Sequence, residues 1–576
     1  MATTNHHINR AIYFQVKDLM RLSQPEQFRE RFELIRAQYN PDKVYLEVYR
    51  HGQTLEASMF ESFANFFCQE GLSVAAGLTT DEPENNAGGF DTLCYTDPES
   101  KKILKQATMT AAPFADELLI DDFFFTNCRC PRCIASKGEQ SWAEFRTRLM
   151  SEMLEEVILP AAKKSNPSVQ IILKLPNWYQ DYNRLGYSAN LAQNQALKLY
   201  VGAETRNPVY TQQHLPKYLS YFITRYIKKI DSNIAGTWID PYEITGNWTW
   251  FAEQIEFTLL AKTPEITLFS LGDLIQPQYK LAFPIAGETI RSMDSYLPTL
   301  GTPTGLACYM PEGATGEDYL HGYIGSLGIP LEPKTAWPEA DSLVLLTESS
   351  AGDPAILDRI HSKLMLGHDV ILTSGFLAAV QGEAFSRRFA PIRVEAQTIT
   401  SQRFAYSVDG GVTFAGVCDS SQQFTFPKIS YGTNDTWEIL AILGEESSAP
   451  LLLKLEYGLG NLYIWTMPHD FGMLPLLPTK VQNPLRLVCT TKDAPVVLRS
   501  PSRVLLFTYD NDCIVLHSLL PWFDRVTLEL RYGYIAVENL ETGEITESEP
   551  VDGIREVQLS LRPGVSYVFK MVNGKR

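Results

Sequence analysis

The chain has 576 residues, of which 45% are hydrophobic and 20% are charged. At roughly 100–200 residues per domain, this length predicts about three domains with buried cores, and the apolar fraction excludes a disordered or collagen-like chain. The formal net charge of −17 argues against a nucleic-acid groove, because such grooves depend on clustered Lys and Arg. Aromatic residues make up 11% of the chain, which fits flat ligands or sugars.

The N-terminal stretch Met1–Arg10 is polar and contains no apolar run of signal-peptide length. The sequence contains no uninterrupted run of ~20 apolar residues, so no membrane span is expected. The nine cysteines are odd in number and irregularly spaced, which argues against a disulfide framework and fits a reducing compartment. We therefore expect a cytoplasmic protein without a membrane partner, or a periplasmic one if a signal peptide had been removed.

Residues 11 to about 280 alternate short apolar runs with stretches of helical periodicity. The eight apolar runs are Ala11–Leu19, Val44–Tyr49, Leu72–Thr79, Leu118–Phe125, Ile171–Tyr179, Leu199–Glu204, Ala235–Asp240 and Ile266–Asp273. Eight strands alternating with helices over ~270 residues is the rhythm of a (β/α)8 TIM barrel. A doubly wound open sheet has the same alternation but rarely reaches eight evenly spaced parallel strands, so we predict the barrel.

The segments after the barrel change character. Apolar runs at 304–309, 342–346 and 370–373, with helical stretches at 317–327 and 353–366, predict a smaller flavodoxin-like α/β unit. Beyond about Arg388 alternating runs take over, and those from Val504 onward predict a C-terminal β-sandwich. We place the catalytic barrel at 1–298, the α/β domain with a β-rich insertion at 299–490, and the sandwich at 491–576.

Acidic residues follow several of the predicted barrel strands, at the C-terminal ends where barrels carry their chemistry. They are Asp121, Asp122, Glu204, Asp240 and Asp273. A single acid of this kind is often a helix N-cap or an ion-pair partner, as Arg206 beside Glu204 illustrates. Four such strand ends in one barrel point instead to a site, and hydrolysis of a glycosidic bond needs two carboxyl groups.

We predict that Asp122 and Glu204 form the catalytic pair, because strands four and six lie two apart and leave a sugar-sized gap. Asp240 is expected to orient water or a sugar hydroxyl, and it is also the alternative partner of Asp122. Strand alternation does not choose between Asp121 and Asp122, because both faces of that run are apolar, and we favour Asp122. The residues expected to bind substrate, some of them by ring stacking, are Asn177, Trp178, Tyr179, Arg206, Trp238, Tyr242, Glu243 and Asp273.

Three cysteines, Cys128, Cys130 and Cys133, follow the fourth strand directly in a Cys-x-Cys-x-x-Cys pattern. A structural zinc usually takes four nitrogen or sulfur ligands, so the fourth would come from Cys94 or Cys68. The alternative is three reduced thiols in a loop. No cofactor is expected for catalysis itself.

A fourth strand ending in Asp-Asp and running into Cys-Arg-Cys-Pro-Arg-Cys resembles uncharacterised glycoside-hydrolase-like barrel proteins of bacteria. The domain order is similar to that of the β-galactosidases of glycoside hydrolase family forty-two, which join a barrel to an amidotransferase-like α/β domain and a small β domain. Residues Ser342–Gly375 resemble that middle domain, and Tyr457–Trp465 resemble its closing hairpin. The resemblance implies a homo-oligomer, either a dimer or a trimer.

One departure limits what the resemblance implies. The β-galactosidases carry Asn-Glu at the end of strand four, where this chain has Asp121-Asp122, so neither their catalytic pair nor their galactoside specificity carries over. The middle domain has no cysteine beside Val370–Gly375 and is expected to be structural. We therefore predict a glycoside hydrolase acting on an oligosaccharide or glycoside. The alternatives are a carbohydrate-binding or degenerate barrel without turnover, and a sugar lyase or isomerase.

Overall fold

A computed structural model of the chain describes residues 7–81, 92–187, 197–206, 215–242, 244, 246–432 and 435–574. The chain divides into two compact units, the first formed by residues 1–215 and 223–297 and the second by residues 216–222 and 298–576. Within the described ranges, every helix is too short or too polar to cross a membrane.

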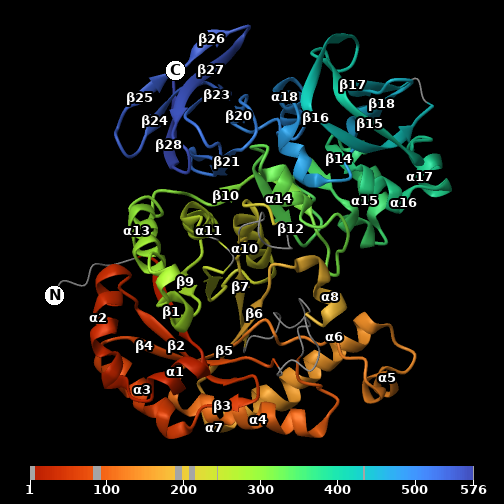
Figure 1. The fold of residues 1–576 in the computed structure, drawn as a ribbon. Coiled ribbons are helices and arrows are strands. Elements are labelled where there is room, and N and C mark those ends of the chain that lie inside the picture. Colours follow the sequence, from red (N-terminus) through yellow and green to blue (C-terminus); the bar gives the residue numbers. More distant parts are fainter. Residues whose placement is uncertain are drawn as a thin grey trace. The chain divides into compact units, whose positions relative to one another are not determined.

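The first unit is a closed barrel of eight parallel strands (Figure 1). The strands are β1 (Asn9–Phe14), β2 (Lys43–Arg50), β4 (Ser73–Leu78), β5 (Glu117–Ile120), β6 (Gln170–Leu175), β7 (Leu197–Gly202), β8 (Gly236–Ile239) and β9 (Glu265–Leu268). A short strand β3 (Gln53–Thr54) folds back on β2. Because β1 pairs with both β2 and β9, the sheet has no free edge. The predicted barrel is confirmed, and the open doubly wound sheet is wrong.

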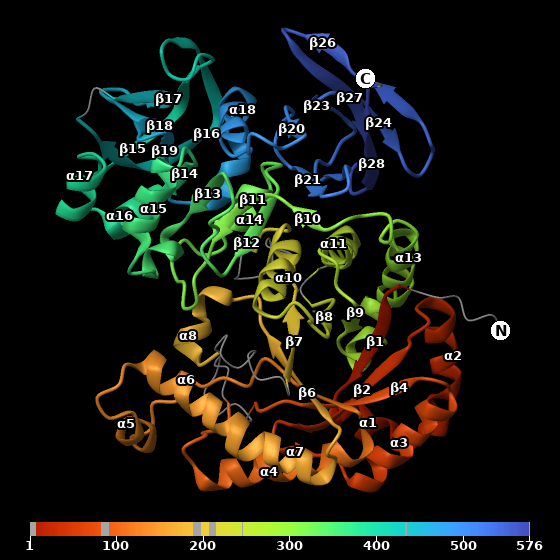
Figure 2. The same ribbon diagram turned by 180° about the vertical axis from the view of Figure 1, so that it is seen from behind.

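Helices cover the outer side of the barrel, as Figure 2 shows for α3, α4 and α7. The helices of seven or more described residues are α1 (Val16–Leu22), α2 (Arg29–Gln38), α3 (Ala57–Gln69), α4 (Pro98–Ala111), α5 (Pro131–Lys137), α6 (Trp142–Glu152), α7 (Leu159–Ser165), α10 (Leu219–Ile230), α11 (Trp248–Leu260) and α13 (Ala282–Asp294). Helix α3 shows the reason for this packing: Phe60, Phe63 and Phe67 are buried at helical spacing and form one apolar face toward the strands.

Several strands are shorter than their apolar runs predict. Strand β1 ends at Phe14 and is followed by α1, and β6 ends at Leu175. Strand β5 ends at Ile120, so the phenylalanines that follow Asp122 lie in a loop, and Asp273 lies on the short helix α12 (Leu271–Leu274) rather than on a strand. The apolar runs continue past the strands because the loops at the barrel mouth are themselves buried.

The interior of the barrel is packed with inward-facing side chains, several of them aromatic. They include Ala11, Tyr13, Tyr45, Ala75, Leu119, Ile172, Tyr200, Trp238 and Phe269. Two glycines make room for the tyrosine rings. A Cβ atom at Gly77 would lie 2.3 Å from Tyr13 Oη, and one at Gly236 would lie 2.6 Å from Tyr200 Oη. Both strands therefore need glycine at the point where a ring approaches the backbone.

The second unit contains a nine-stranded mixed sheet. Five strands pair in parallel in the order β12 (Leu331–Lys334), β11 (Leu306–Tyr309), β13 (Leu343–Leu346), β14 (Asp369–Thr373) and β19 (Gly460–Trp465). This is the 2-1-3-4-5 order of flavodoxin-like folds, which confirms the predicted α/β class. The sheet continues antiparallel through β18 (Ser448–Tyr457), β17 (Thr436–Leu443), β15 (Arg393–Ser407) and β16 (Phe414–Ser430).

Helices of this unit include α14 (Leu320–Gly325), α15 (Ile356–Met365), α16 (Ser374–Val380), α17 (Glu383–Arg388) and α18 (Thr479–Val488). The chain then forms two antiparallel sheets. One contains β10 (Pro303–Thr304), β21 (Val504–Tyr509), β22 (Cys513–Ser518), β28 (Ser566–Asn573), β24 (Tyr534–Asn539) and β25 (Ile545–Glu547), and the other contains β20 (Val496–Leu498), β23 (Asp524–Leu530), β27 (Ile554–Leu561) and β26 (Glu549–Val551). Both sheets contribute to one apolar core, so the predicted β-sandwich is confirmed.

We expect Gly77→Ala to destabilise the barrel by about 1–3 kcal/mol, because it adds a carbon to a filled core. The ring of Tyr13 is fully buried and its hydroxyl donates to Glu47 at 2.9 Å, so it has no room to move aside. Denaturant unfolding followed by circular dichroism measures the change. Gly352→Ala, which places its Cβ in open space, is the control and should unfold like the parent. An unchanged midpoint for Gly77→Ala would contradict this account of the packing.

Candidate active site

The C-terminal ends of the barrel strands surround a cavity of about 340 Å³. This volume lies within the range of about 300–1,000 Å³ that is typical of ligand pockets. The cavity is lined by Gln15, Lys17, Arg50, His51, Asp121, Asp122, Phe123, Lys174, Pro176, Asn177, Trp178, Glu204, Arg206, Trp238, Asp240, Tyr242 and Phe269. Carboxyl groups, cations and aromatic rings therefore meet in one hollow, which suits a polar ligand with flat faces.

Lys174 lies among the acidic residues of the cavity. Its ammonium nitrogen is 2.8 Å from Asp122 Oδ2 and 3.2 Å from Asp121 Oδ1. A third carboxylate oxygen, Glu204 Oε1, is 3.5 Å away, and the centroid of the Trp238 ring is 4.2 Å away. Strand β6 places Lys174 there because it runs between β5 and β7, and the acids follow those two strands. One cation thus contacts three carboxyl groups.

The pKa values of the two adjacent aspartates shift in opposite directions. Burial raises the pKa of Asp121, but the charges of Lys174 and Arg50 outweigh this effect and hold the pKa below its ordinary value. The Arg50 guanidinium is 2.9 Å from Asp121 Oδ2. Burial raises the pKa of Asp122 to about 8; Lys174 opposes this rise, and the charges of Asp121 and Glu204 reinforce it. Asp122 is therefore protonated at neutral pH beside an ionised Asp121.

Glu204 and Asp240 follow β7 and β8. Burial raises the pKa of Glu204, the Lys174 ammonium opposes the rise, and the charge of Asp240 adds to it. Asp240 Oδ2 forms an ion pair with Arg206 at 3.1 Å, and its Oδ1 accepts the backbone N–H of Tyr242 at 3.1 Å. Both oxygens of Asp240 are thus fixed by partners of its own, whereas Glu204 shares its cation with the aspartates.

The residues expected to bind substrate are only partly brought together. Five of them line the cavity: Asn177, Trp178, Arg206, Trp238 and Tyr242. Tyr179 does not line it, because its side chain is buried and its ring packs 5.7 Å from Tyr226. Asp273 is not in the lining either; it accepts hydrogen bonds from the hydroxyl of Tyr242 and, at 2.6 Å, from Ser270 Oγ. Glu243 lies outside the described residues.

Two buried cations of the site, Lys174 and Arg50, are not among the residues predicted from the sequence. Lys174 interrupts the otherwise apolar run Ile171–Leu175 within β6, and Arg50 ends β2. A charged side chain inside a buried strand is expensive unless it is paired, so this interruption is a usable signal for an internal ion-pair cluster.

Four cysteines, Cys94, Cys128, Cys130 and Cys133, form a cluster whose sulfur atoms all lie within 4.8 Å of one another. The Sγ of Cys94 is 3.7 Å from those of Cys130 and Cys133 and 3.8 Å from that of Cys128. Sulfurs bound tetrahedrally to zinc at roughly 2.3 Å lie about 3.8 Å apart. The cluster therefore fits a structural zinc, with Cys94 as the fourth ligand, while Cys68 is exposed on α3.

Comparison with protein families assigns all three parts of the chain. A model described as "Probable glycosyl hydrolase, catalytic domain" matches residues 1–296. The models "Uncharacterized protein SSO3021, second domain" and "Probable glycosyl hydrolase, C-terminal domain" match residues 301–470 and 495–568. The uncharacterized protein SSO3021 of the archaeon Saccharolobus solfataricus is 24% identical over 360 residues, which covers 55% of this chain and 59% of that protein's length.

Solved structures share the fold along nearly the whole chain. A β-galactosidase from Bacillus circulans sp. alkalophilus has a TM-score of 0.67 at 10% identity, covering 98% of this chain and 99% of its own. The family 42 β-galactosidase Gan42B from G. stearothermophilus has a TM-score of 0.62 at 11% identity, covering 99% of each chain. An α-L-fucosidase from Paenibacillus thiaminolyticus has a TM-score of 0.67 at 10% identity, covering 99% of this chain and 100% of its own. The arrangement of barrel, α/β domain and C-terminal β-sheets is therefore that of family 42.

We expect the protein, purified without chelators, to contain about one zinc ion per chain, because the four thiols match a closed zinc site. Cys94→Ser removes one ligand and should lower both the zinc content and the melting temperature. Cys68→Ser is the matched control and should keep the zinc. Elemental analysis measures the metal. A parent protein without metal, or a Cys94→Ser variant that retains it, would contradict the assignment.

Proposed function

The chain belongs to the family of probable glycosyl hydrolases, and from this premise we propose that it hydrolyses a glycosidic bond of an oligosaccharide or glycoside at the barrel mouth. The observation that carries the proposal is the contact of Asp122 and Glu204 with the same Lys174 ammonium. Glycoside hydrolysis needs one carboxyl group that carries a proton and a second that is ionised.

Asp122 is the general acid of this proposal. Its raised pKa keeps the carboxyl protonated at neutral pH, so it has a proton to give to the leaving glycosidic oxygen as the bond to the anomeric carbon breaks. Asp121, ionised between Lys174 and Arg50, keeps a negative charge next to Asp122 and so favours the protonated form. In this proposal Asp122 donates the proton, and Asp121 remains ionised and favours the protonated form of Asp122.

Glu204 is the nucleophile. Its carboxylate oxygen bonds to the anomeric carbon while Asp122 protonates the leaving oxygen, and water, losing its proton to Asp122, then displaces Glu204 from the sugar. Asp122 Oδ2 and Glu204 Oε1 both contact the Lys174 nitrogen, at 2.8 and 3.5 Å. These two oxygens are therefore closer together than the roughly 6.5–9.5 Å that separates the carboxyl groups of an inverting pair. This spacing lies below the range of an inverting pair, and we therefore propose that the reaction retains configuration.

Other side chains of the cavity fit the binding of a sugar. Asp240, held by Arg206 and the Tyr242 amide, is placed as an acceptor for water or a sugar hydroxyl. Trp178 is half-buried in the lining and offers a ring face for stacking. Trp238 is buried between Lys174 and Phe269, with its ring centroid 4.7 Å from that of Phe269, and supports the floor of the cavity.

Replacing either acid by its amide should abolish most of the activity. We expect Asp122→Asn and Glu204→Gln each to lower kcat on an active aryl glycoside by about 100-fold to 10,000-fold with the fold intact. Glu117→Gln, at the opposite end of β5, is the matched control and should stay near the parent. Near-normal turnover in both amide variants would show the assignment to be wrong, and Asp121 with Asp240 would be the next pair. Sugar binding without hydrolysis across a glycoside panel would favour a non-catalytic barrel.

The pH profile tests the charge of Lys174. We expect a bell-shaped kcat/KM with its alkaline limb near pH 8, because activity is lost as Asp122 gives up its proton. Lys174→Met removes the cation that favours the ionised carboxylates, so the pKa values of Asp122 and Glu204 should rise and both limbs should move to higher pH. Lys174→Arg keeps the charge and should keep the limbs in place. Unmoved limbs in Lys174→Met would contradict this role.

A further inference from the structure

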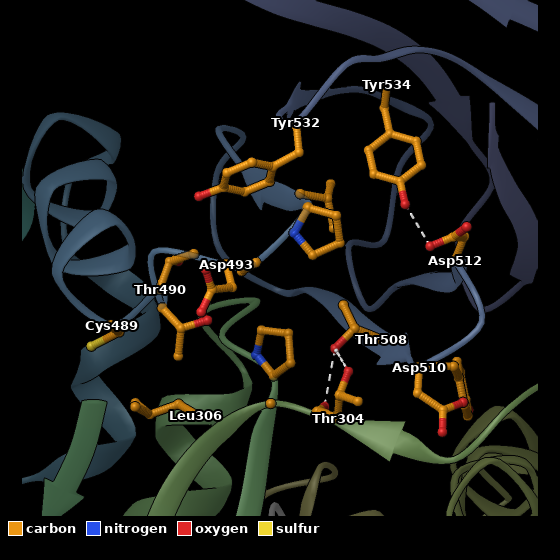
Figure 3. Close-up of a pocket in the computed structure, with 17 residues that line it drawn as sticks. Thr304, Leu306, Cys489, Thr490, Asp493, Thr508, Asp510, Asp512, Tyr532 and Tyr534 are labelled. Atoms are coloured by element: carbon orange, nitrogen blue, oxygen red, sulfur yellow. Dashed lines mark hydrogen bonds between the residues drawn. The ribbon is translucent and has the colours of Figure 1, made fainter. Parts of the chain in front are cut away.

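A second cavity, of about 380 Å³, lies wholly within the second unit (Figure 3). We call it the sandwich cavity. Its lining residues are Thr304, Gly305, Leu306, Pro330, Cys489, Thr490, Thr491, Asp493, Ala494, Pro495, Val496, Thr508, Tyr509, Asp510, Asp512, Tyr532 and Tyr534. It shares no lining residue with the cavity at the barrel mouth. Its volume is within the range of ligand pockets, so a molecule of the size of a sugar unit fits.

Two tyrosine rings form one side of the sandwich cavity, across from Thr304 and Thr508 in Figure 3. Tyr534 is fixed, because its hydroxyl donates to Asp512 at 2.5 Å. Tyr532 is 59% exposed, so its ring is available to a ligand. Flat faces of this kind stack on the apolar faces of sugar rings.

The backbone at Tyr532 adopts a conformation that does not suit tyrosine. Tyr532 and Gly533 are the central residues of a turn in which the Tyr534 amide donates to the Arg531 carbonyl at 3.2 Å. Their φ angles are 54° and 83°, both in the left-handed region. Asn, Asp and Gly are favoured at such positions, and a bulky side chain is strained there. The turn therefore does not require tyrosine, whereas the binding of a flat ligand to its ring would explain why tyrosine stands at this position.

The other walls present neutral hydroxyls and carboxylate oxygens. Thr304 and Thr508 are joined by a hydrogen bond of 3.0 Å, and Thr490 and Asp493 lie on another side of the cavity. Asp510 accepts the Thr302 amide at 2.8 Å. Carboxylates already held by neutral donors retain lone pairs that accept the hydroxyls of a polyol.

The charge of the sandwich cavity excludes several ligand classes. None of the described residues that line it is Lys, Arg or His; Lys492 and Arg531 line an adjoining hollow on the other side of Tyr532 and Tyr534. Among the described residues, the cysteine cluster is the one group of three or more His, Cys, Asp or Glu side chains placed to hold a metal ion, so the aspartates of this cavity do not form such a group. A neutral molecule with many hydroxyls matches the lining best.

We propose that the sandwich cavity is a second carbohydrate-binding site, which takes a neutral sugar unit against Tyr532 while the threonines and aspartates bind its hydroxyls. Such a site holds a saccharide chain on the protein without taking part in bond cleavage. It stands on the lining of this cavity and does not depend on the hydrolysis proposed for the barrel.

The test is affinity electrophoresis of the full-length Asp122→Asn protein in native gels that contain galactan, xyloglucan, glucomannan, arabinoxylan or amylopectin. At least one of these neutral polysaccharides should retard the protein. Tyr532→Asn removes the ring but suits the turn, so it should keep or raise the melting temperature while raising the dissociation constant about tenfold, the loss expected for a stacked ring. Tyr532→Phe keeps the ring and should bind nearly as the parent does.

Two controls separate this site from other surfaces. Trp178→Ala tests binding at the barrel mouth, and Trp522→Ala tests an exposed aromatic ring of the same unit outside the cavity. Both variants should keep the retardation. The proposal is overturned if no polysaccharide retards the protein, if the dissociation constant of Tyr532→Asn equals that of the parent, or if either tryptophan variant abolishes the retardation. Binding of the diamine putrescine in place of sugars would overturn it in favour of an organic cation. None of these outcomes depends on whether the barrel hydrolyses a substrate.

Discussion

The ammonium group of Lys174 is the charge on which the barrel mouth depends. Buried charges lose their hydration, and only close pairing compensates for that loss. Lys174 contacts Asp121, Asp122 and Glu204, and Arg50 contacts Asp121 together with two further acids, Glu47 and Asp81. Carboxyl groups outnumber cations in this cluster, so not all of them can be ionised at neutral pH. The proton falls on Asp122, because the charges of Asp121 and Glu204 add to the effect of burial and raise its pKa.

The loops after β4 and β5 connect this charge cluster to the cysteines. The loop after β5 begins with Asp121 and Asp122 and continues to Cys128, Cys130 and Cys133, while Cys94 belongs to the segment after β4. A metal held by the four thiols would join the two segments and so stabilise the loop that carries the acid. The Tyr187 hydroxyl donates to the Asp122 carbonyl and holds the same loop from another side. The proposed acid is thus fixed through its backbone as well as through its carboxyl group.

The barrel and most of its acids could be predicted because they depend on local patterns. Apolar runs at regular intervals, separated by helical stretches, indicate parallel strands. The C-terminal ends of parallel strands lie at the same mouth of a barrel, independently of which side chains they carry. The acids at positions 121, 122, 204 and 240 therefore had to lie near one another. The lysine within β6 indicates a buried ion pair, but the sequence does not name its partners, because Asp121, Asp122 and Glu204 follow the neighbouring strands β5 and β7.

The sequence by itself determined the classes of the domains, the closure of the barrel and the set of acids at its mouth, because hydrophobic periodicity acts over short stretches of chain. Only the tertiary structure decided which of two adjacent aspartates is protonated, that Cys94 rather than Cys68 completes the thiol cluster, and that Trp178 rather than Tyr179 faces the cavity. Each of these choices depends on burial or on distances between segments far apart in the chain. Coulomb interactions and desolvation are set by those distances, and sequence order does not contain them.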